Sequence, residues 1–597
     1  MTQPLLTWDL SELYAGADDP RLAADLEELE TRAQAFAECY RGRVDRLTPG
    51  EFAEALTAYE AIRSDSAVPA AFAQLLFAAD SNNPAHGALL QRVQEREVAL
   101  ERALVFFSLE LIEIPDHRFA VLLEHPGVAR YRHFLEHTRA GRPHRLSEPE
   151  ERILMEKSVT GRSAFTRLFD EILSAAVFTL ETGHTRKEMN LSEILAGLYH
   201  PDRAVRAAAA AGISAGLQER ARLFTFVTNT LVYDKAVDDR LTRYEHPEAA
   251  RHLSDEIETE TVHTMLDACA AHFHTVARYY HLKREMLGLD RLYHYDRYAP
   301  LFPEESTVPW EVARDVVVDA YSAFSSELGA LAKRFFEERW IDAEVRPGKR
   351  SGAFCMGITP HRHPYVLMNY LGKMRDVMTL AHELGHGIHD LLAAGQPYLE
   401  YYPSLAAAET ASVFGEMLTF DRLLAQHASP RERLSLLTGK VEDIFATVFR
   451  QCAMYRFEQR LHAARRERGE LLTEQVNELW QETLQQMFGD SVEMGEGHRT
   501  WWMYIPHFVH TPFYVYAYAF GQLLVVALYA RYQREGEAFV PRYLEILRAG
   551  GSRRPAQLMA LAGVDIGRRD FWEGGLRVID ALVTEIEEEW RKRRTEG

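Results

Sequence analysis

The sequence predicts a mainly α-helical protein built from many helices, and three observations indicate this fold class. Apolar residues recur at helical spacing along most of the chain, for example in LAADLEELE from Leu22 and FAEAL from Phe52. Proline, glycine and asparagine separate such segments at Pro49-Gly50 and Asn82-Asn83-Pro84, where helices are expected to begin and end. Segments that favour β-strands occur at only two places, both short. We therefore expect helical hairpins through the N-terminal part of the chain.

The chain of 597 residues is long enough for more than one domain. We expect an N-terminal helical region over residues 1–200 and a second region over 201–597, which carries the motifs described below. A short β-hairpin is expected over Phe178–Met189, because Thr182-Gly183 is a turn signal between two short strand-like runs. The apolar-periodic run from Trp310 to Phe336 predicts one long helix.

Composition and charge exclude several classes of protein. With 47% hydrophobic and 26% charged residues the composition is that of an ordinary globular protein, and the formal net charge of −20 argues against binding nucleic acid or an anionic membrane. The N-terminal sequence MTQPLLTWDLSELY lacks the features of a signal peptide, and the apolar run Phe513–Tyr529 is short for a membrane span. None of the four cysteines forms a CxxC pair, so reduced thiols and a cytoplasmic location are expected.

The segment Asp376–Asp390, DVMTLAHELGHGIHD, contains an HExxH motif at His382, Glu383 and His386. On a helix the two histidines lie on one face, one turn apart, where both can bind one metal ion. Glu383 is then placed to hold the water molecule that the metal activates. The alternative is a helix whose histidines make hydrogen bonds in the core.

Two features around this motif predict what lies beside the helix. Gly385 and Gly387 are unfavourable in a helix, so another backbone or a substrate is expected to pass close by. Two short strands are expected before the helix, within Arg346–Gly357 and Pro364–Tyr370, with a sheet edge facing the cleft. A peptide substrate could extend that edge as an extra strand. The alternative is a loop and hairpin without such a role.

A third metal ligand is expected after the helix, because a catalytic zinc usually has three protein ligands and one open position. Glu409 is the candidate, in a run of small residues that lets helices approach closely. Glu416, seven residues on, shares its helical face and could orient a ligating histidine. The alternative is that both carboxylates are solvated, although their apolar neighbours argue against it.

The segment His498–Gly521, HRTWWMYIPHFVHTPFYVYAYAFG, is rich in groups that can donate hydrogen bonds to an oxyanion. The alternative for each tyrosine is an aromatic side chain packed in the core. The candidate donors are His507, His510, Tyr514, Tyr516 and Tyr518.

Five motifs follow one another along the chain: GKRSGAF, PYVLMNY, DVMTLAHELGH, AAETASVFGE and HFVHTPFYVYAYAFG. In this order they resemble the motifs of the M3 family of zinc metallopeptidases, most closely its oligoendopeptidase F branch. The resemblance extends from TWDLSELY, which starts near Trp8, to about Gly521, and so covers nearly the whole chain.

The resemblance implies a two-lobed helical fold with a deep central channel that admits short peptides, and a small β-sheet beside the HExxH helix. It implies one zinc ion per chain, bound by His382, His386 and Glu409. In this family pattern Glu383 resembles the general base, and Glu416 matches a further glutamate of the motif.

The resemblance also implies residues that contact the substrate. His507 and Tyr514 look like the histidine and tyrosine that contact the substrate carbonyl, with His510, Tyr516 and Tyr518 as alternatives. The substrate-edge strand of the family is similar to the segment Gly352, Ala353 and Phe354.

We therefore predict a zinc endopeptidase that cleaves internal bonds of short, unfolded oligopeptides. Zinc is preferred to cobalt or manganese on ligand type and availability. A zinc metallocarboxypeptidase on a similar helical scaffold is the first alternative, and a non-catalytic peptide-binding protein is the second. The sequence leaves open whether the protein is a monomer or a homodimer.

Overall fold

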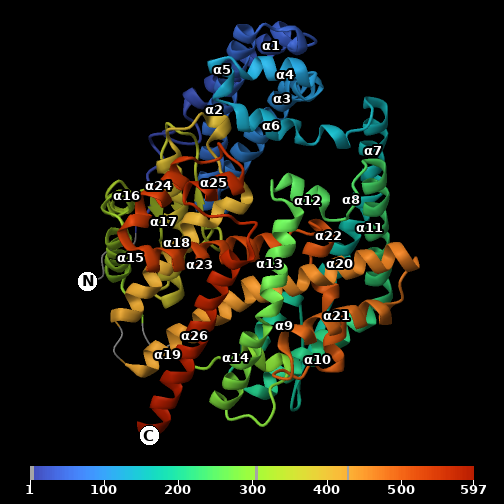
Figure 1. Ribbon diagram of the computed structural model, residues 1–597, viewed down its shortest axis with the longest axis vertical. Helices are drawn as coiled ribbons and strands as arrows, with labels where there is room; N and C mark the ends of the chain where they lie inside the picture. The colour runs from blue at the N-terminus through green and yellow to red at the C-terminus, as the bar shows by residue number, and fades with distance from the viewer. Residues whose placement is uncertain (1–5, 303–306, 427–428, 597) are drawn as a thin grey trace. The chain divides into compact units, whose positions relative to one another are not determined.

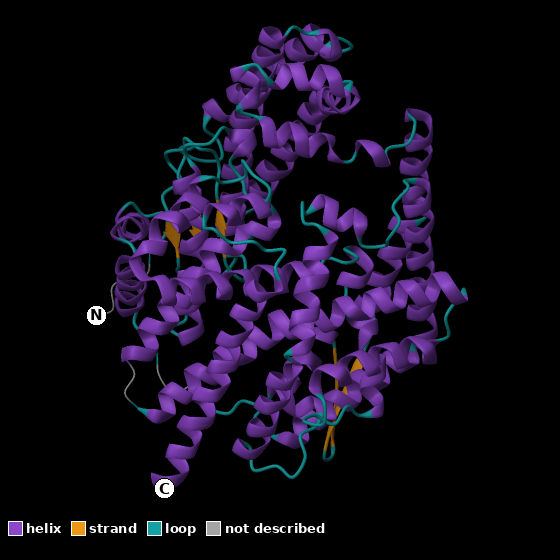
Figure 2. Ribbon diagram, in the orientation of Figure 1, coloured by secondary structure: helices purple, strands orange, loops and turns teal. Residues whose placement is uncertain are grey.

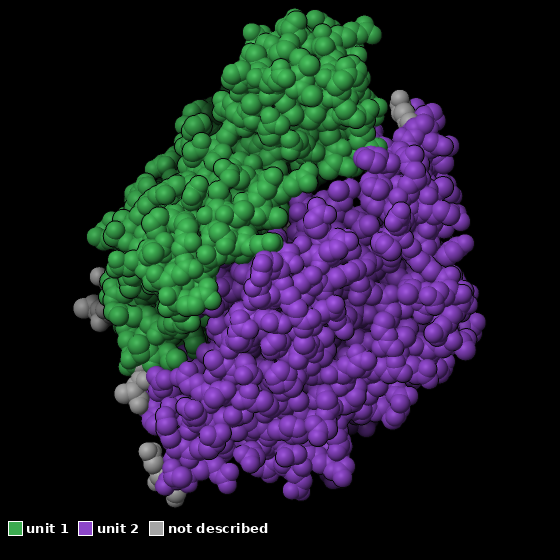
Figure 3. Space-filling view, viewed as in Figure 1, with its two compact units in different colours: residues 1–142, 305–426, 531–565 green, residues 143–304, 427–530, 566–597 purple. Residues whose placement is uncertain are grey.

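The computed structural model describes residues 6–302, 307–426 and 429–596, and helices make up 73% of the chain. The predicted mainly α-helical fold is thus confirmed, and Figure 2 shows strands only as short segments among the helices. The chain forms two compact units, which Figure 3 colours separately. Unit 1 comprises residues 1–142, 305–426 and 531–565; unit 2 comprises residues 143–304, 427–530 and 566–597. This division differs from the one expected at residue 200, because the chain returns to unit 1 twice.

Three N-terminal helices of unit 1 begin directly after a capping residue, and two of these starts, at Pro49 and Pro84, lie at the predicted breaks. Asp19, Thr48 and Asn83 each accept a hydrogen bond from a backbone N–H of the first helical turn, and a proline follows each of them. These helices surround a core that contains Phe36, Phe52 and other buried apolar residues. The helices of unit 1 before residue 142 are α1 (Pro20–Tyr40), α2 (Pro49–Ala79), α3 (Pro84–Glu113), α4 (Asp116–Leu123), α5 (Pro126–Ala129) and α6 (Arg132–Ala140).

The remaining helices of unit 1 include the two that carry the metal-binding motifs, labelled α17 and α18 in Figure 1. They are α15 (Trp310–Phe324), α16 (Ser326–Glu337), α17 (Met374–Ala393), α18 (Leu405–Gln426), α24 (Val540–Arg548) and α25 (Pro555–Leu561).

The prediction of one long helix over Trp310–Phe336 is wrong, because the helix breaks at Ser325. The backbone of Ser325 is extended, with φ −155° and ψ 126°, so the run folds into α15 and α16. A Cβ on Gly329 would lie 2.0 Å from Ser322 Oγ, so glycine allows the two helices to pack closely. Helical periodicity continues through this break, and the sequence pattern therefore does not reveal it.

A three-stranded sheet precedes α17, one strand more than predicted. Its order is β3 (Ile341–Asp342), β5 (Tyr365–Leu367), β4 (Phe354–Met356), with β4 antiparallel and β3 parallel to β5. The two residues of β3 are too short a run to be recognised from periodicity. The buried Lys349 fixes the loop between β3 and β4, because its Nζ lies 2.8 Å from Asp342 Oδ1 and 2.6 Å from Met368 O. Strand β4 lies at an edge of the sheet, as expected.

Unit 2 contains the predicted hairpin, formed by β1 (Phe178–Thr182) and β2 (Thr185–Met189). Its other elements are helices α7 (Glu148–Thr160), α8 (Arg162–Ser174), α9 (Leu191–Ala196), α10 (Arg203–Glu219), α11 (Ala221–Leu241), α12 (Ala249–Ser254), α13 (Thr259–Ala271), α14 (Phe273–Met286), α19 (Pro430–Ile444), α20 (Arg450–Arg468), α21 (Thr473–Phe488), α22 (His507–His510) and α26 (Arg569–Glu596).

A π-helical segment, Phe445–Phe449, joins α19 to α20, and two 3₁₀ helices span His294–Tyr298 (η4) and Glu496–Tyr504 (η7). Helix α23 (Tyr516–Glu535) begins in unit 2 and ends in unit 1, and it contains most of the apolar run Phe513–Tyr529. None of the described helices has the length and apolar character needed to cross a membrane.

Candidate metal centre

Helices α17 and α18 of unit 1 pack at very short range, and glycines make this possible. A Cβ on Gly385 would lie 2.5 Å from the Cα of Ser412 in α18, so the expectation that another backbone passes here is confirmed. A Cβ on Gly387 would lie 2.3 Å from the ring of Phe335. On α18, Gly415 leaves room for Tyr321, whose hydroxyl donates a hydrogen bond to Ala381 O at 2.8 Å.

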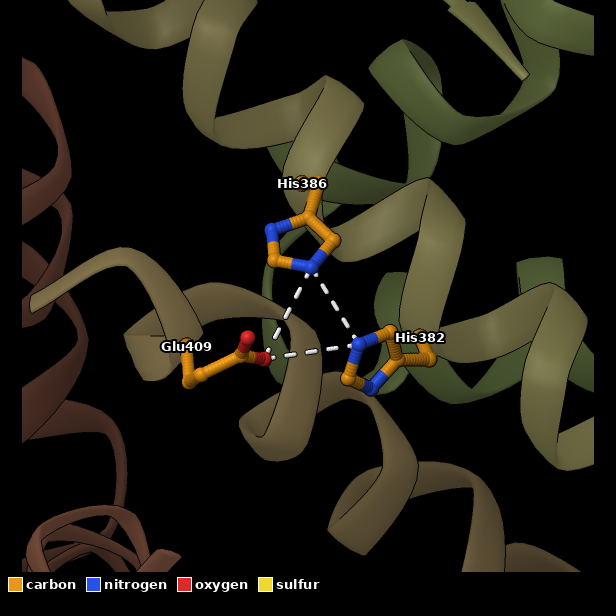
Figure 4. A group of neighbouring side chains, drawn as sticks. All are labelled: His382, His386 and Glu409. Atoms are coloured by element: carbon orange, nitrogen blue, oxygen red, sulfur yellow. Dashed lines mark hydrogen bonds and ion pairs between the residues drawn. The ribbon is translucent and has the colours of Figure 1, made fainter. Parts of the chain in front are cut away.

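The close packing brings together the three side chains that were predicted to bind metal (Figure 4). His382 Nε2 lies 3.2 Å from His386 Nε2 and 3.4 Å from Glu409 Oε2, and the third separation, His386 Nε2 to Glu409 Oε2, is 3.6 Å. Ligands at about 2.0–2.1 Å from a tetrahedral zinc ion are roughly 3.3 Å apart. The three ligand atoms therefore fit a zinc ion, and they form the one such group found among the described residues.

Glu416 holds His382 in the orientation that metal binding needs. Its Oε1 lies 2.6 Å from His382 Nδ1, so that nitrogen carries the proton and Nε2 faces the other two ligands. Burial alone would lower the pKa of His382, but the hydrogen bond and charge of Glu416, with the charge of Glu409, raise it to about 9. The negative charge of the nearby carboxylates therefore stabilises the protonated imidazole of His382, and it would stabilise a bound metal cation for the same reason.

Glu383 is a buried carboxyl group whose pKa is raised towards neutral pH. Its side chain is only 7% exposed, and burial is the main cause that raises its pKa to about 7. The charge of His382 and a hydrogen bond from the Cys355 N–H act in the opposite direction. That hydrogen bond also connects Glu383 to β4, the edge strand beside α17.

Two partners of Glu409 and its helix were not identified from the sequence. Ser412 Oγ donates a hydrogen bond to Glu409 Oε2 at 2.7 Å, and Tyr543 donates one to Thr410 O at 2.9 Å. Ser412 lies three residues after Glu409, a helical spacing that could have revealed it. Tyr543 comes from α24 and Tyr321 from α15, and no local signal points to either residue.

The predicted substrate-edge residues lie at the start of β4. Gly352 adopts a φ of 85°, which favours glycine, and its carbonyl oxygen accepts a hydrogen bond from Asn369 Nδ2 at 3.1 Å. Ala353 precedes the strand and Phe354 is its first residue, paired with Leu367 of β5. The side chain of Phe354 packs against the core of unit 1.

The predicted oxyanion donors belong to unit 2, and three of them lie together. His507 Nε2 is 3.2 Å from the Tyr518 hydroxyl, and the rings of His507 and Tyr514 are parallel with centroids 6.4 Å apart. Arg251 lies over the Tyr514 ring at 5.5 Å. Burial, followed by the charge of His510, lowers the pKa of His507, so its imidazole is neutral near pH 7.

The other two candidates are engaged elsewhere in unit 2. His510 Nε2 lies 2.8 Å from Asp170 Oδ1. The Tyr516 hydroxyl donates a hydrogen bond to Asp255 Oδ2 at 2.8 Å, and the residue is fully buried. The structure thus groups Tyr518, and not these two residues, with His507 and Tyr514.

Known proteins resemble this chain over most of its length. The model of Peptidase family M3 matches residues 197–578, and the Oligopeptidase F model matches residues 110–178. Oligopeptidase PepF of Bacillus subtilis is 28% identical over 516 residues, which cover 85% of this chain and 76% of that protein. An oligoendopeptidase F homolog of Lactococcus lactis is 25% identical and covers 98% of this chain and 97% of its own.

Solved structures share the fold. A crystal structure from Chlamydophila abortus matches with a TM-score of 0.90 at 23% identity, covering 99% of this chain and 100% of that chain. Oligoendopeptidase-F from Enterococcus faecium matches with a TM-score of 0.70 at 22% identity, covering 96% and 98% of the two chains. The family model spans more than half of the sequence and includes all three candidate metal ligands. The chain therefore belongs to peptidase family M3.

Proposed function

We propose that this protein is a zinc-dependent endopeptidase that hydrolyses internal bonds of short, unfolded oligopeptides. The observation that carries the proposal is the cluster of His382, His386 and Glu409, with their ligand atoms 3.2–3.6 Å apart and Glu383 beside them. The names of the relatives, oligopeptidase and oligoendopeptidase F, support the substrate class.

His382, His386 and Glu409 would hold one zinc ion, and Glu416 would keep His382 in the tautomer that presents Nε2. A bound zinc ion supplies Lewis-acid activation of a water molecule and of the scissile carbonyl. Glu383, with a pKa of about 7, would take a proton from the attacking water and pass it to the leaving amine.

Other residues are proposed to act on the substrate directly. His507 and Tyr514 donate hydrogen bonds to the oxygen that becomes negative in the transition state, and Tyr518, which contacts His507, is a third candidate. The edge of β4 that does not pair with β5 would bind the peptide backbone, beside the Cys355 N–H that contacts Glu383, so binding would depend little on the side chains of the substrate.

The test is mass spectrometry of a peptide of about ten residues that is blocked at both ends, incubated with the protein with and without a chelator. We expect internal cuts that disappear with chelator and return with added zinc. Stepwise removal of C-terminal residues from an unblocked peptide, with the blocked peptide intact, would contradict endopeptidase activity and indicate a carboxypeptidase. Absence of any cleavage by the zinc-loaded protein would overturn the proposal.

A further inference from the structure

A cavity of about 240 Å³ in unit 2 contains two arginines that have no carboxylate partner among the described residues. Arg297 comes from the 3₁₀ helix η4, and Arg450 is the first residue of α20, directly after the π-helical segment. Such segments occur frequently at functional sites. Aromatic and imidazole side chains complete the cavity: Tyr298, Trp480, His498, Trp501, Tyr504 and His507.

The carboxylates beside this cavity already have cationic partners. Asp296 accepts hydrogen bonds from Arg203 at 2.8 Å and from Arg206 at 2.9 Å. Glu442 accepts one from Lys283 at 2.5 Å and a second from Tyr279 at 2.5 Å.

Arg297 and Arg450 are the charged residues among those that line the cavity. The neighbouring carboxylates Asp296 and Glu442 are engaged by Arg203, Arg206 and Lys283, so no described carboxylate offsets the two arginines. Their positive charge stands out in a chain whose formal net charge is −20.

Arg297 is buried, Arg450 is half-buried, and neighbouring groups hold both guanidinium groups in place. Arg297 is 7% exposed, lies between the rings of Tyr298 at 5.1 Å and Phe488 at 4.9 Å, and donates from Nε to His294 O. Arg450 donates a hydrogen bond to the Tyr298 phenol. A guanidinium cannot lose its proton in a protein, and a buried charge without a partner destabilises the fold.

A second polar group in the same cavity also lacks a partner. His498 is 2% exposed, and its Nδ1 is buried without a hydrogen bond to any described group. Buried polar atoms are nearly always satisfied by protein, water or ligand. The two guanidinium groups and this imidazole therefore line one polar cavity, and its cationic lining suits a negatively charged ligand.

We propose that this cavity binds an anion between Arg297 and Arg450. The possible ligands share one property: each carries a negative charge and can accept hydrogen bonds from both guanidinium groups, as carboxylates and small inorganic anions do. One source is the carboxylate of a peptide, and this part rests on the proposed function, because His507 lines the same cavity. The other source is a dissolved anion such as chloride.

Binding is tested on the full-length protein by thermal unfolding and by tryptophan fluorescence, because Trp480 and Trp501 line the cavity. Chloride, acetate and phosphate are titrated at constant ionic strength in a buffer whose only other anion is a bulky sulfonate. We expect a saturable response in the wild type. Arg450→Gln and Arg297→Gln should weaken it at least about tenfold, since each removes hydrogen bonds from a charged donor. The exposed Arg468→Gln, at the end of α20, is the matched control and should respond as the wild type does.

Stability without anions provides a second readout. Arg450→Gln removes a half-buried charge that has no carboxylate partner among the described residues, so in the sulfonate buffer its unfolding temperature should equal or exceed that of the wild type. If Arg450→Gln does not fold, Arg297→Gln and Arg450→Lys carry the test. A wild type that responds to none of the anions, or variants that respond as the wild type does, would overturn the proposal. Tyrosinate absorbance from Tyr298 at neutral pH, with no anion response, would overturn it too, because the phenolate would then be the counter-ion.

The Glu383→Gln variant distinguishes a peptide carboxylate from a dissolved anion, because this variant should leave a bound peptide intact. If a peptide with a free C-terminus displaces chloride and its C-terminal amide does not, the cavity takes the peptide carboxylate. If neither peptide competes, it takes the dissolved anion. Neither result depends on cleavage, so a protein that responds to chloride but cleaves no peptide would refute the peptidase proposal and leave the anion site standing.

Discussion

The candidate metal centre of unit 1 and the arginine cavity of unit 2 carry opposite surpluses of charge. At the candidate metal centre the carboxylates Glu383, Glu409 and Glu416 lie near two histidines, and the three clustered ligand atoms fit a cation. In the cavity Arg297 and Arg450 lack carboxylate partners among the described residues, so the charge of its lining suits an anion. An uncompensated buried charge costs folding free energy, so each surplus indicates the charge of the ligand that offsets it.

The two regions also differ in how their side chains are held. Glu416 contacts His382 and Ser412 donates a hydrogen bond to Glu409, so two of the candidate metal ligands have polar partners. Arg297 is held by aromatic rings and a carbonyl oxygen, and Arg450 by a phenol. Substitutions in each region test whether the two regions bind their ligands independently.

The largest effect is expected for Glu383→Gln. The amide cannot accept the proton of the attacking water, so kcat should fall by roughly 10²–10⁴. Zinc should remain, because Glu383 is not one of the three clustered ligands. Metal analysis and cleavage kinetics on the same sample check both points, and a wild-type rate would refute the role of Glu383.

Removal of a metal ligand should abolish zinc binding in unit 1 without changing anion binding in unit 2. Glu409→Ala should lose zinc and activity while it keeps the chloride response of the cavity. Conversely, Arg450→Gln should lose the chloride response and bind zinc as the wild type does. Full metal content in Glu409→Ala would remove Glu409 from the ligand set, and loss of both ligands in either variant would show that the regions are coupled.

A smaller effect is expected for Glu416→Gln, which keeps the shape of the side chain but weakens its hydrogen bond to His382 Nδ1. Loss of such a supporting partner typically lowers metal affinity by about 10–100-fold. Competition with a chromogenic zinc chelator measures this change. An unchanged zinc affinity would mean that Glu416 does not orient His382.

Glu458 of α20 avoids a buried charge without a ligand, because a carboxyl group can keep its proton and stay neutral. An arginine cannot do this, because its guanidinium group does not lose its proton in a protein. Burial raises the pKa of Glu458 from 4.5 to about 8, while a hydrogen bond from the Phe513 N–H, at 2.9 Å, acts against this. The folded state therefore holds a proton that the unfolded state releases between about pH 4.5 and 8. The contribution of Glu458 to stability is present below pH 4.5 and is lost as pH rises to 8.

In that window the free energy of unfolding should fall with pH by roughly 1.4 kcal/mol per unit from this group. Glu458→Gln should remove this slope, which denaturant unfolding at several pH values would measure. A slope equal to that of the wild type would show that Glu458 is ionised in the folded protein.

The sequence was most informative where the signal is local. The HExxH spacing placed His382 and His386 on one helical face, and Thr182-Gly183 marked the hairpin turn. Glu409 was identified because a catalytic zinc needs a third ligand, and the structure places it beside the two histidines.

Features that depend on distant parts of the chain were not predictable. Ser325 breaks a run that keeps its helical period, and β3 contains only two residues. Arg297 and Arg450 are far apart in the sequence and meet only in the folded unit, so no spacing rule connects them. The expected channel and the roles of His507 and Tyr514 stay predictions.

The most direct test of zinc-dependent cleavage is a zinc titration of the metal-free protein in which peptide cleavage and bound zinc are measured together. If the protein is a zinc endopeptidase, its activity should rise in proportion to bound zinc and stop rising at one zinc per chain. Glu409→Ala should show no rise. Full cleavage by the metal-free protein, or zinc bound at one per chain without any cleavage, would contradict zinc-dependent cleavage.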